Sequence, residues 1–339
     1  MANSNLPRSI VSLRRRRTHL AGLALTWYAL VEPSAYAQPA YPARPIRIIV
    51  PFGPATGLDA AARGLAAQLA QQLGVGVVVE NRKGAGGAIG SALVQSQPAD
   101  GYTLLYAANP PFLTQPMLLR AAGYDALRGF TPIAKIASTP MALVASNTAP
   151  YGDFQQFVEY ARKNPGRINF AYAGAGTLSY LDMQRINLLT GITSTAVSYK
   201  SATQAMIETI GGQVDLMMPS YPTALPFIRN GSVKLLAVGS PKRSELFPDV
   251  PTFEEALKQP GFHSLVWHGL LGPAGMRPEV SKRLQDEVQK ALGVKQIVEL
   301  LEKGGASASY LGAVDFQRVL AGEEEQARKL LNQLGMKPE

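Results

Sequence analysis

The sequence predicts an α/β protein built from two α/β halves, and three observations lead to this prediction. Short apolar runs typical of buried strands alternate with segments of helical periodicity. This alternation stops around residues 130–146, where two extended stretches flank a proline, and then starts again, which indicates a crossing into a second half. The 339 residues are enough for two ordinary domains, and the apolar content of 46% suits a full core.

The first half begins with a strand, a turn and a helix. The run at 46–50 (IRIIV) is apolar except for Arg47, as expected for a buried parallel strand. The turn 51–57 (PFGPATG) leads into a segment, 58–73, with apolar residues at helical spacing. Further strands are expected at 75–81 and 102–108. Alternating strands and helices predict a parallel sheet covered on both faces.

The second half shows the same alternation and is followed by a return. Helices are expected at 153–163, 178–190, 202–210 and in a proline-bearing segment that ends near Gly231, and strands at 168–173, 195–199, 214–218 and 233–239. A strand at 265–275 and helices at 280–292 and 316–334 then bring the chain back to the first half. The predicted organisation is therefore a first lobe of residues 38–137 and 241–339 and a second lobe of residues 138–240.

Residues 1–37 have the order of a secretory signal peptide: a basic head with Arg14–Arg17, an apolar stretch at 20–31, and AYA ending at Ala37. Twelve residues span about 18 Å as a helix, less than the roughly 30 Å of a bilayer core, so a permanent anchor is the weaker alternative. We expect cleavage after Ala37 during export. The choice between the general and the twin-arginine export route stays open. Cleavage removes five arginines and Glu32, which lowers the formal net charge from +9 to +5.

Composition excludes several functions. The chain has no cysteine, which excludes thiol catalysis, disulfides and cysteine-ligated metals. The basic residues of the mature part are scattered without aromatic interleaving, so nucleic acid is not an expected partner. We find neither a G-x-S-x-G elbow nor a phosphate-binding P-loop, and no catalytic set or metal site is predicted.

The glycine-rich loop 80–90 (ENRKGAGGAIG) raises the question of a dinucleotide site. Gly84 and Gly86 fit the G-x-G-x-x-G pattern, but Ile89 stands where the third glycine belongs, and the loop follows the second strand instead of the first. We interpret these glycines as structural, allowing positive φ angles and close helix packing, and predict no cofactor.

Two other glycine turns are better candidates for ligand binding. Each one follows a strand and opens a helix: 51–59 (PFGPATGLD) in the first half and 173–181 (AGAGTLSYL) in the second. Helix N-termini offer unpaired N–H groups and a positive dipole end, so two such turns across a cleft could hold one anion. Thr56 and Asp59 have the spacing of a capping pair, and Asp59 either caps or contacts ligand. Thr177 either caps its helix or points its hydroxyl outward.

Other polar and aromatic residues have simpler interpretations. His263 and His268, read as five apart on one strand, are expected on opposite faces and in structural roles, with ligand contact by a histidine near a cleft as the alternative. Trp267 is expected in core or domain-interface packing, with ligand contact as the alternative. The acidic run Glu323–Glu325 is expected on the solvent-exposed face of the last helix.

Several collinear motifs resemble the Bug family, the TctC-like extracytoplasmic solute receptors of tripartite tricarboxylate transport systems. They include RPIRIIVPFGP, GVVVENRKGAGGAIG, DGYTLLYA, NPGRINFAYAGAGT, SYKSATQAMIETIGGQVDLMM and LLAVGSPKRSELFPDVPTFEEA, in that order along the chain. The resemblance implies a two-lobed periplasmic-binding-protein fold (a type II Venus flytrap) with a hinge of two crossing segments. It further implies a small carboxylate held by backbone amides, helix ends and waters.

By motif matching, the resemblance places ligand contacts at both turns and at three further segments. The implied ligand-binding residues are Phe52, Gly53, Thr56, Gly57, Asp59, Asn109, Gly174, Ala175, Gly176, Thr177, Tyr199, Ser201 and Ser220. The chain departs from the family pattern in three places: Ala55 and Thr56 replace a glycine pair, Tyr180 replaces a common histidine, and Pro219 and Ser220 replace an acid and an amide. Loss of that acid argues against an amine-bearing ligand.

The function expected from these features is that of a monomeric, periplasmic solute-binding protein that captures an organic carboxylate by hinge closure and delivers it to a membrane transporter. Two alternatives stay open: an exported receptor for a sensor kinase, and an exported enzyme acting on a small carboxylate. The double change Thr56→Ala and Thr177→Ala is expected to weaken carboxylate binding and to leave the melting of the empty protein unchanged.

Overall fold

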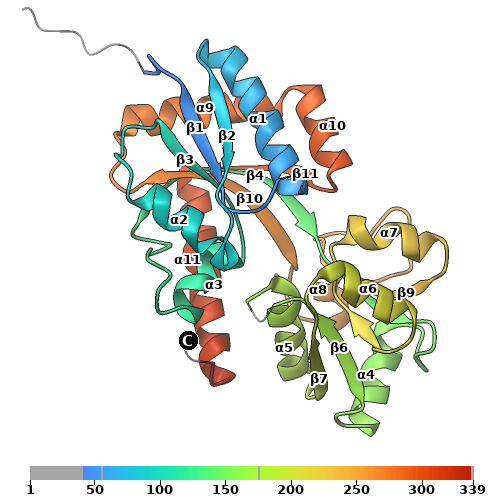
Figure 1. Ribbon diagram of the computed structural model, residues 1–339. Coiled ribbons are helices and arrows are strands. Elements are labelled where there is room, and N and C mark those ends of the chain that lie inside the picture. Colours follow the sequence, from blue (N-terminus) through green and yellow to red (C-terminus); the bar gives the residue numbers. More distant parts are fainter. Residues whose placement is uncertain (1–40, 55, 175, 337–339) are drawn as a thin grey trace, which may run out of the picture. The chain divides into compact units, whose positions relative to one another are not determined.

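The computed structural model describes residues 41–336, apart from residues 55 and 175. The predicted signal peptide (1–37) and its cleavage site after Ala37 lie outside these described residues. Pro42–Glu339 form one compact unit, whose two sheets are shown in Figure 1. No helix among the described residues has the length and apolar character needed to cross a membrane.

The first sheet has six strands, several of which the sequence predicted. In spatial order they are β11 (Ser307–Gly312), β4 (Phe130–Pro140), β10 (Leu265–Pro273), β3 (Thr103–Ala108), β1 (Ile46–Val50) and β2 (Val77–Asn81). β1 is parallel to β2 and β3, whereas β10 and β11 run antiparallel to β4, and β10 runs antiparallel to β3. The sheet is therefore mixed and not parallel as predicted, because β4 and β10 carry the chain in opposite directions between the two sheets.

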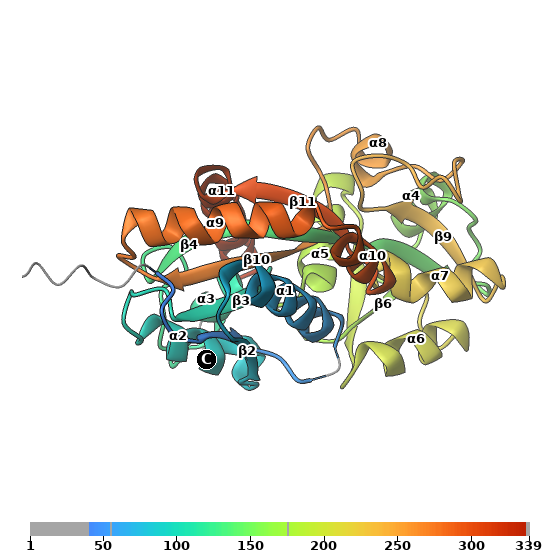
Figure 2. The same ribbon diagram turned by 90° about the horizontal axis from the view of Figure 1, so that it is seen from above.

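Helices cover both faces of the first sheet (Figures 1 and 2). One group consists of α1 (Gly57–Leu73), α9 (Pro278–Leu292) and α10 (Lys295–Lys303), and the other of α2 (Ala88–Gln95), which follows the short 3₁₀ turn η1 (Ala85–Gly87), α3 (Pro111–Leu118) and α11 (Ala313–Gln333). The second group packs on a core with Phe112, Trp267 and Phe316 at its centre.

The second sheet has five strands and is also mixed. In order they are β7 (Ser194–Ser198), β6 (Ile168–Tyr172), β8 (Leu216–Met217), β5 (Ala142–Ser146) and β9 (Val233–Val238). Its helices are α4 (Phe154–Lys163), α5 (Leu178–Thr190), α6 (Ala202–Ile210), α7 (Tyr221–Arg229) and α8 (Phe253–Leu257). Alternate residues of β5 belong to two different cores, Leu143 to one and Val144 to the other, so both sheet faces are buried.

The chain crosses between the sheets twice, and the two crossings are hydrogen-bonded to each other. Met141 separates β4 from β5, and residues 239–264 separate β9 from β10. The Gly239 N–H donates to the Met141 carbonyl at 2.7 Å, the Met141 N–H to the Ser264 carbonyl at 2.9 Å, and the Ser264 N–H to the Gly239 carbonyl at 3.0 Å. A Cβ at Gly239 would lie 2.2 Å from the Ser264 oxygen, so only glycine fits there.

The boundaries of the two predicted lobes stay a prediction, since Pro42–Glu339 form one unit. Phe253 and Phe262, which follow residue 240, pack in a core of the second sheet with Phe154.

Candidate functional site

The two glycine turns have nearly identical geometry. Thr56 is the N-cap of α1 with φ −82° and ψ 160°, and Thr177 is the N-cap of α5 with φ −82° and ψ 154°. Each hydroxyl donates to a carbonyl three residues back, of Gly53 at 3.2 Å or Gly174 at 2.7 Å. Each also accepts from a backbone N–H three residues ahead, and in this way begins its helix.

Both turns open on one cavity of about 410 Å³, which we call the helix-end cavity. N-terminal residues of five helices line it: α1, α3, α5, α6 and α7. Its lining residues are Phe52, Thr56, Leu58, Ala108, Asn109, Pro110, Pro111, Met141, Tyr172, Ala173, Thr177, Leu178, Ser179, Ala202, Met217, Met218, Pro219, Ser220, Val266 and His268.

The electrostatic character of the helix-end cavity comes from the backbone. None of its lining residues in the described part of the chain is Asp, Glu, Lys or Arg. The first N–H groups of a helix have no partner within that helix, and the dipole places partial positive charge beside them. Proline at N-cap and N1 of α3 removes two such donors, and Pro222 at N2 of α7 removes one. The N–H groups therefore come from α1, α5, α6 and the remaining first-turn residues of α7.

The structure brings five of the predicted ligand-binding residues together at this cavity, namely Phe52, Thr56, Asn109, Thr177 and Ser220. The other described ones do not line it: Gly53, Gly57, Asp59, Gly174, Gly176, Tyr199 and Ser201. Ala175 lies outside the described residues. Ser201 caps α6 by accepting the Gln204 N–H at 3.2 Å, and its neighbour Ala202 lines the cavity.

Asp59 and Asn109 are already engaged within the protein. The Asp59 side chain is buried and accepts from Asn81 Nδ2 at 2.8 Å and Arg63 Nε at 3.0 Å. The Asn109 Oδ1 accepts the Trp267 N–H at 2.6 Å, and its Nδ2 donates to the Leu265 carbonyl and to Glu323, both at 3.1 Å. Asn109 thus joins β3 to β10 and α11.

Because Thr56 and Thr177 both cap helices, the sequence-based expectation for their alanine variants changes. Loss of a capping hydroxyl leaves a backbone N–H without its partner, which typically costs about 1 kcal/mol. The melting temperature of the empty double variant is now expected to fall.

His268 is the one titratable side chain other than tyrosine that lines the helix-end cavity among the described residues. Its Nδ1 lies 3.4 Å from the Tyr106 hydroxyl. Burial lowers the pKa of His268 to about 4, so its imidazole is neutral at pH 7. His263 precedes β10 and is not on the strand as predicted; its Nε2 lies 2.9 Å from a Glu254 oxygen.

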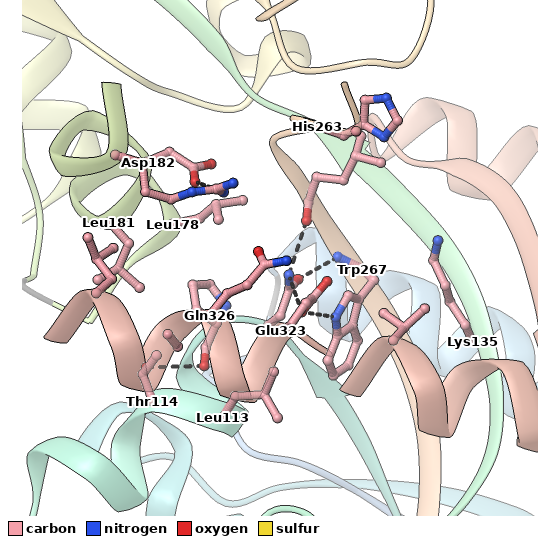
Figure 3. Close-up of a pocket in the computed structure, with 18 residues that line it drawn as sticks. Leu113, Thr114, Lys135, Leu178, Leu181, Asp182, His263, Trp267, Glu323 and Gln326 are labelled. Atoms are coloured by element: carbon pink, nitrogen blue, oxygen red, sulfur yellow. Dashed lines mark hydrogen bonds and ion pairs between the residues drawn. The ribbon is translucent and has the colours of Figure 1, made fainter. Parts of the chain in front are cut away.

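A second cavity, of about 310 Å³, shares Asn109, Pro110 and Leu178 with the helix-end cavity. We call it the charged cavity, because Lys135, Asp182, Arg185 and Glu323 line it. Figure 3 labels three of them, Lys135, Asp182 and Glu323. His263, Gln326 and Trp267 line the cavity as well, with leucines from α3 and α5.

Glu323 lines the charged cavity, whereas the sequence predicted it on the solvent-exposed face of the last helix, and that prediction is wrong. Its Oε2 accepts from Trp267 Nε1 at 2.8 Å and from Asn109 Nδ2 at 3.1 Å (Figure 3). Burial raises the pKa of Glu323 to about 7, against the opposing effect of these hydrogen bonds and of Lys135. Glu323 follows Phe316 by seven residues and Leu320 by three, so helical spacing already places it on the buried face of α11.

Asp182 and Arg185 form an ion pair in the charged cavity. Arg185 Nη1 lies 2.9 Å from Asp182 Oδ1, and the Ser264 hydroxyl donates to Asp182 Oδ2 at 2.5 Å. Burial raises the pKa of Asp182, and Arg185 opposes that shift. Asp182 therefore ties α5 to the crossing segment at Ser264.

The glycine loop 80–90 packs against the first turn. A Cβ at Gly90 would lie 2.9 Å from both the Arg82 carbonyl and a Pro51 side-chain carbon. Close backbone approach therefore accounts for this glycine, in agreement with the structural interpretation. In the described part of the chain, no three His, Cys, Asp or Glu side chains are grouped so that they could hold a metal ion.

Two mixed sheets, two hydrogen-bonded crossings and a cavity at helix ends are the features of a two-lobed periplasmic binding protein. Comparison with known families is more specific: the model described as tripartite tricarboxylate transporter family receptor (TctC) matches residues 61–336. The chain belongs to this family of solute-binding receptors.

Individual relatives agree with this assignment. The UPF0065 protein in the tcbD-tcbE intergenic region of Pseudomonas sp. strain P51 is 34% identical over 333 residues, which cover 98% of this chain and 97% of the relative. The solved periplasmic binding protein BugD has 32% identity and a TM-score of 0.70, covering 88% of this chain and 100% of BugD.

Two further solved structures carry ligands in their descriptions. An R. palustris protein with adipate has 29% identity and a TM-score of 0.73, covering 88% of this chain and 100% of its own. MatC from Rhodopseudomonas palustris with bound malate has 28% identity and a TM-score of 0.69, covering 86% of this chain and 100% of MatC.

Proposed function

We propose that this protein is a periplasmic receptor that captures a small organic carboxylate in the helix-end cavity and delivers it to the membrane subunits of a tripartite tricarboxylate-type transporter. In this proposal the chain is exported, loses residues 1–37, acts as a monomer, uses no cofactor and leaves its ligand chemically unchanged.

One observation carries the proposal: N-terminal residues of α1, α5, α6 and α7 line a single cavity that has no charged side chain in its described lining. Unpaired N–H groups at helix ends suit an anion, and the absence of an acidic side chain avoids repelling it. A hydrogen bond to a charged group contributes roughly 1.5–3 kcal/mol. Three or four of them, after entropic costs, are enough for micromolar binding at about −8 kcal/mol.

The helices that supply these N–H donors pack on both sheets. α1, whose N-cap is Thr56, packs on the first sheet, whereas α5, α6 and α7 pack on the second sheet. A ligand that accepts from both groups binds a closed arrangement better than an open one, and this difference in affinity shifts the population toward closure. The paired crossings at Met141 and Ser264 are the proposed hinge.

The ligands of the relatives agree in chemical class. Adipate and malate, named with two of the solved structures, are both small organic carboxylates. Of the residues implied by family resemblance, we assign carboxylate contact to the turns at Thr56 and Thr177 and to Ser220, through the backbone N–H groups that follow them.

A matched pair of variants at Ser179 tests the proposal. Ser179 is buried, lines the helix-end cavity and is the second residue of α5, where an acid favours the helix. Ser179→Asp places a negative charge beside the proposed carboxylate, whereas Ser179→Asn adds similar volume without charge. Isothermal titration calorimetry with benzoate, hexanoate, adipate, malate and citrate first identifies the tightest ligand for the wild type.

For that ligand we expect at least tenfold weaker binding in Ser179→Asp than in Ser179→Asn, with both variants folded by circular dichroism. If none of the five acids binds the wild type, the proposed function is wrong. If both variants bind equally well, the carboxylate does not lie at these helix ends.

A further inference from the structure

We infer that the ligand is a monocarboxylate with an apolar body, aromatic or of medium chain length, and not an amino acid or a hydroxylated di- or tricarboxylate. This inference rests on the proposed function and specifies its ligand. It comes from the uneven distribution of polar groups in the helix-end cavity.

The floor of the helix-end cavity is apolar and buried. Met141, Met217 and Met218 are 7%, 3% and 1% exposed, and all three line the cavity. They gather because Met141 stands at the first crossing and forms an isolated antiparallel bridge with Ser220, just after β8. Val266 of β10 lines the same cavity.

Three of the four donor helices begin at the accessible part of the lining. Thr56, the N-cap of α1, and Ala202, the first residue of α6, are exposed, and Thr177, the N-cap of α5, is half-buried. Ser220, the N-cap of α7, is bridged to Met141 and lies beside the floor. The cavity therefore combines the N-termini of α1, α5 and α6 at its accessible part with a buried floor of methionine and aliphatic side chains. A molecule with a single carboxylate and an apolar body matches both parts at once.

Polar groups on the body of a ligand would have few partners in the floor. The Asn109 amide uses both of its polar atoms within the protein, and the capping hydroxyls of Thr56 and Thr177 donate to Gly53 and Gly174. His268 is neutral at pH 7 and therefore offers a hydrogen bond but no positive charge to a second carboxylate, and no acid lines the described cavity to pair with an ammonium group. A buried polar group without a partner costs roughly tenfold in affinity or more.

Methionine suits such a floor physically. Its unbranched thioether side chain adapts to irregular apolar shapes and makes favourable sulfur–aromatic contacts. Two aromatic residues, Phe52 and Tyr172, also line the cavity. An aromatic ring or a short alkyl chain would meet soft apolar surface on several sides.

The test compares ligands first. Calorimetric titration of the wild type at pH 7 is expected to give at least tenfold tighter binding of benzoate or hexanoate than of malate, citrate or aspartate. If malate, citrate or aspartate binds as tightly as the apolar acids or tighter, this inference is overturned and the proposed function stands. If none of the acids binds, the proposed function itself fails.

Variants of the floor then locate the apolar body. Met217→Gln puts an amide into the floor at nearly constant length, and we expect at least fivefold weaker binding of the preferred apolar acid. Met217→Leu keeps the floor apolar and is expected to bind within threefold of wild type. Val266→Thr, which changes shape very little, provides the same test if Met217→Gln melts below the assay temperature. Wild-type affinity in Val266→Thr and in a folded Met217→Gln would contradict the inference.

Discussion

The helix-end cavity and the charged cavity are neighbours that share Asn109, Pro110 and Leu178, yet they are built on opposite electrostatic plans. In the charged cavity, acids meet bases and hydrogen-bond donors of the protein: Asp182 pairs with Arg185, and Glu323 accepts from Trp267 and Asn109. In the helix-end cavity no charged side chain lines the described wall, and positive potential comes from helix N-termini.

This difference distinguishes charged groups that stabilise the fold from backbone donors that can bind a ligand. Charges that already have partners inside the protein hold elements together, as Asp182 does for α5 and the crossing segment at Ser264. Backbone N–H groups in the first turn of a helix have no partner within the helix, and those that the cap hydroxyl does not accept are available to a ligand. The second plan also avoids a long charged side chain whose conformational freedom must be lost on binding.

The largest expected effect that distinguishes the two cavities is on the pH dependence of the free energy of unfolding. The pKa of Glu323 is raised from 4.5 to about 7, so the folded state holds more protons than the unfolded state in that window. Its contribution therefore falls as pH rises from 4.5 to 7. The pKa of His268 is lowered from 6.5 to about 4, so its contribution is lost as pH falls from 6.5 to 4.

In the wild type the effects of Glu323 and His268 on the pH dependence of stability oppose each other. A variant that removes one of the two groups leaves the effect of the other measurable. Denaturant unfolding at pH 5 and pH 7 is expected to show Glu323→Gln gaining stability with rising pH by about 2 kcal/mol more than wild type. Its amide oxygen keeps both accepted hydrogen bonds. His268→Gln is expected to lose stability relative to wild type over the same pH range. The double variant lacks both titrating groups and is expected to show neither difference. Identical pH dependence of all four proteins would show that these groups do not titrate as proposed.

A smaller effect concerns the helix-end cavity. Thr56→Ala and Thr177→Ala each remove a capping hydroxyl, and each is expected to lower the free energy of unfolding by about 1 kcal/mol. Carboxylate affinity is expected to fall as well, because the helix ends become less ordered. Thr→Ser at the same positions keeps the hydroxyl and serves as control. Alanine variants that melt like the serine variants would contradict the capping role.

Local patterns predicted much of the fold. The run IRIIV forms β1 with the predicted bounds, because a strand that is buried on both faces has a mostly apolar sequence. Thr56 and Thr177 were recognisable as candidate caps because capping is a relation over three residues. The antiparallel pairing of β4 and β10 was missed, since it depends on where the chain crosses between the sheets.

What the sequence could not reveal depends on distant partners. An acidic run reads as exposed, but Glu323 meets Asn109, which lies 214 residues away in the chain, and Trp267, 56 residues away. The apolar floor has the same origin, because Met141 lies at a crossing, Met217 in β8 and Val266 in β10. No local window contains these groups together.

A crystal structure of the protein with its tightest-binding carboxylate tests the central claim most directly. We predict carboxylate oxygens about 2.9 Å from backbone nitrogens in the first turns of α1 and α5, with the body of the ligand against the methionines. A carboxylate paired with Lys135 or Arg185 in the charged cavity would contradict the account.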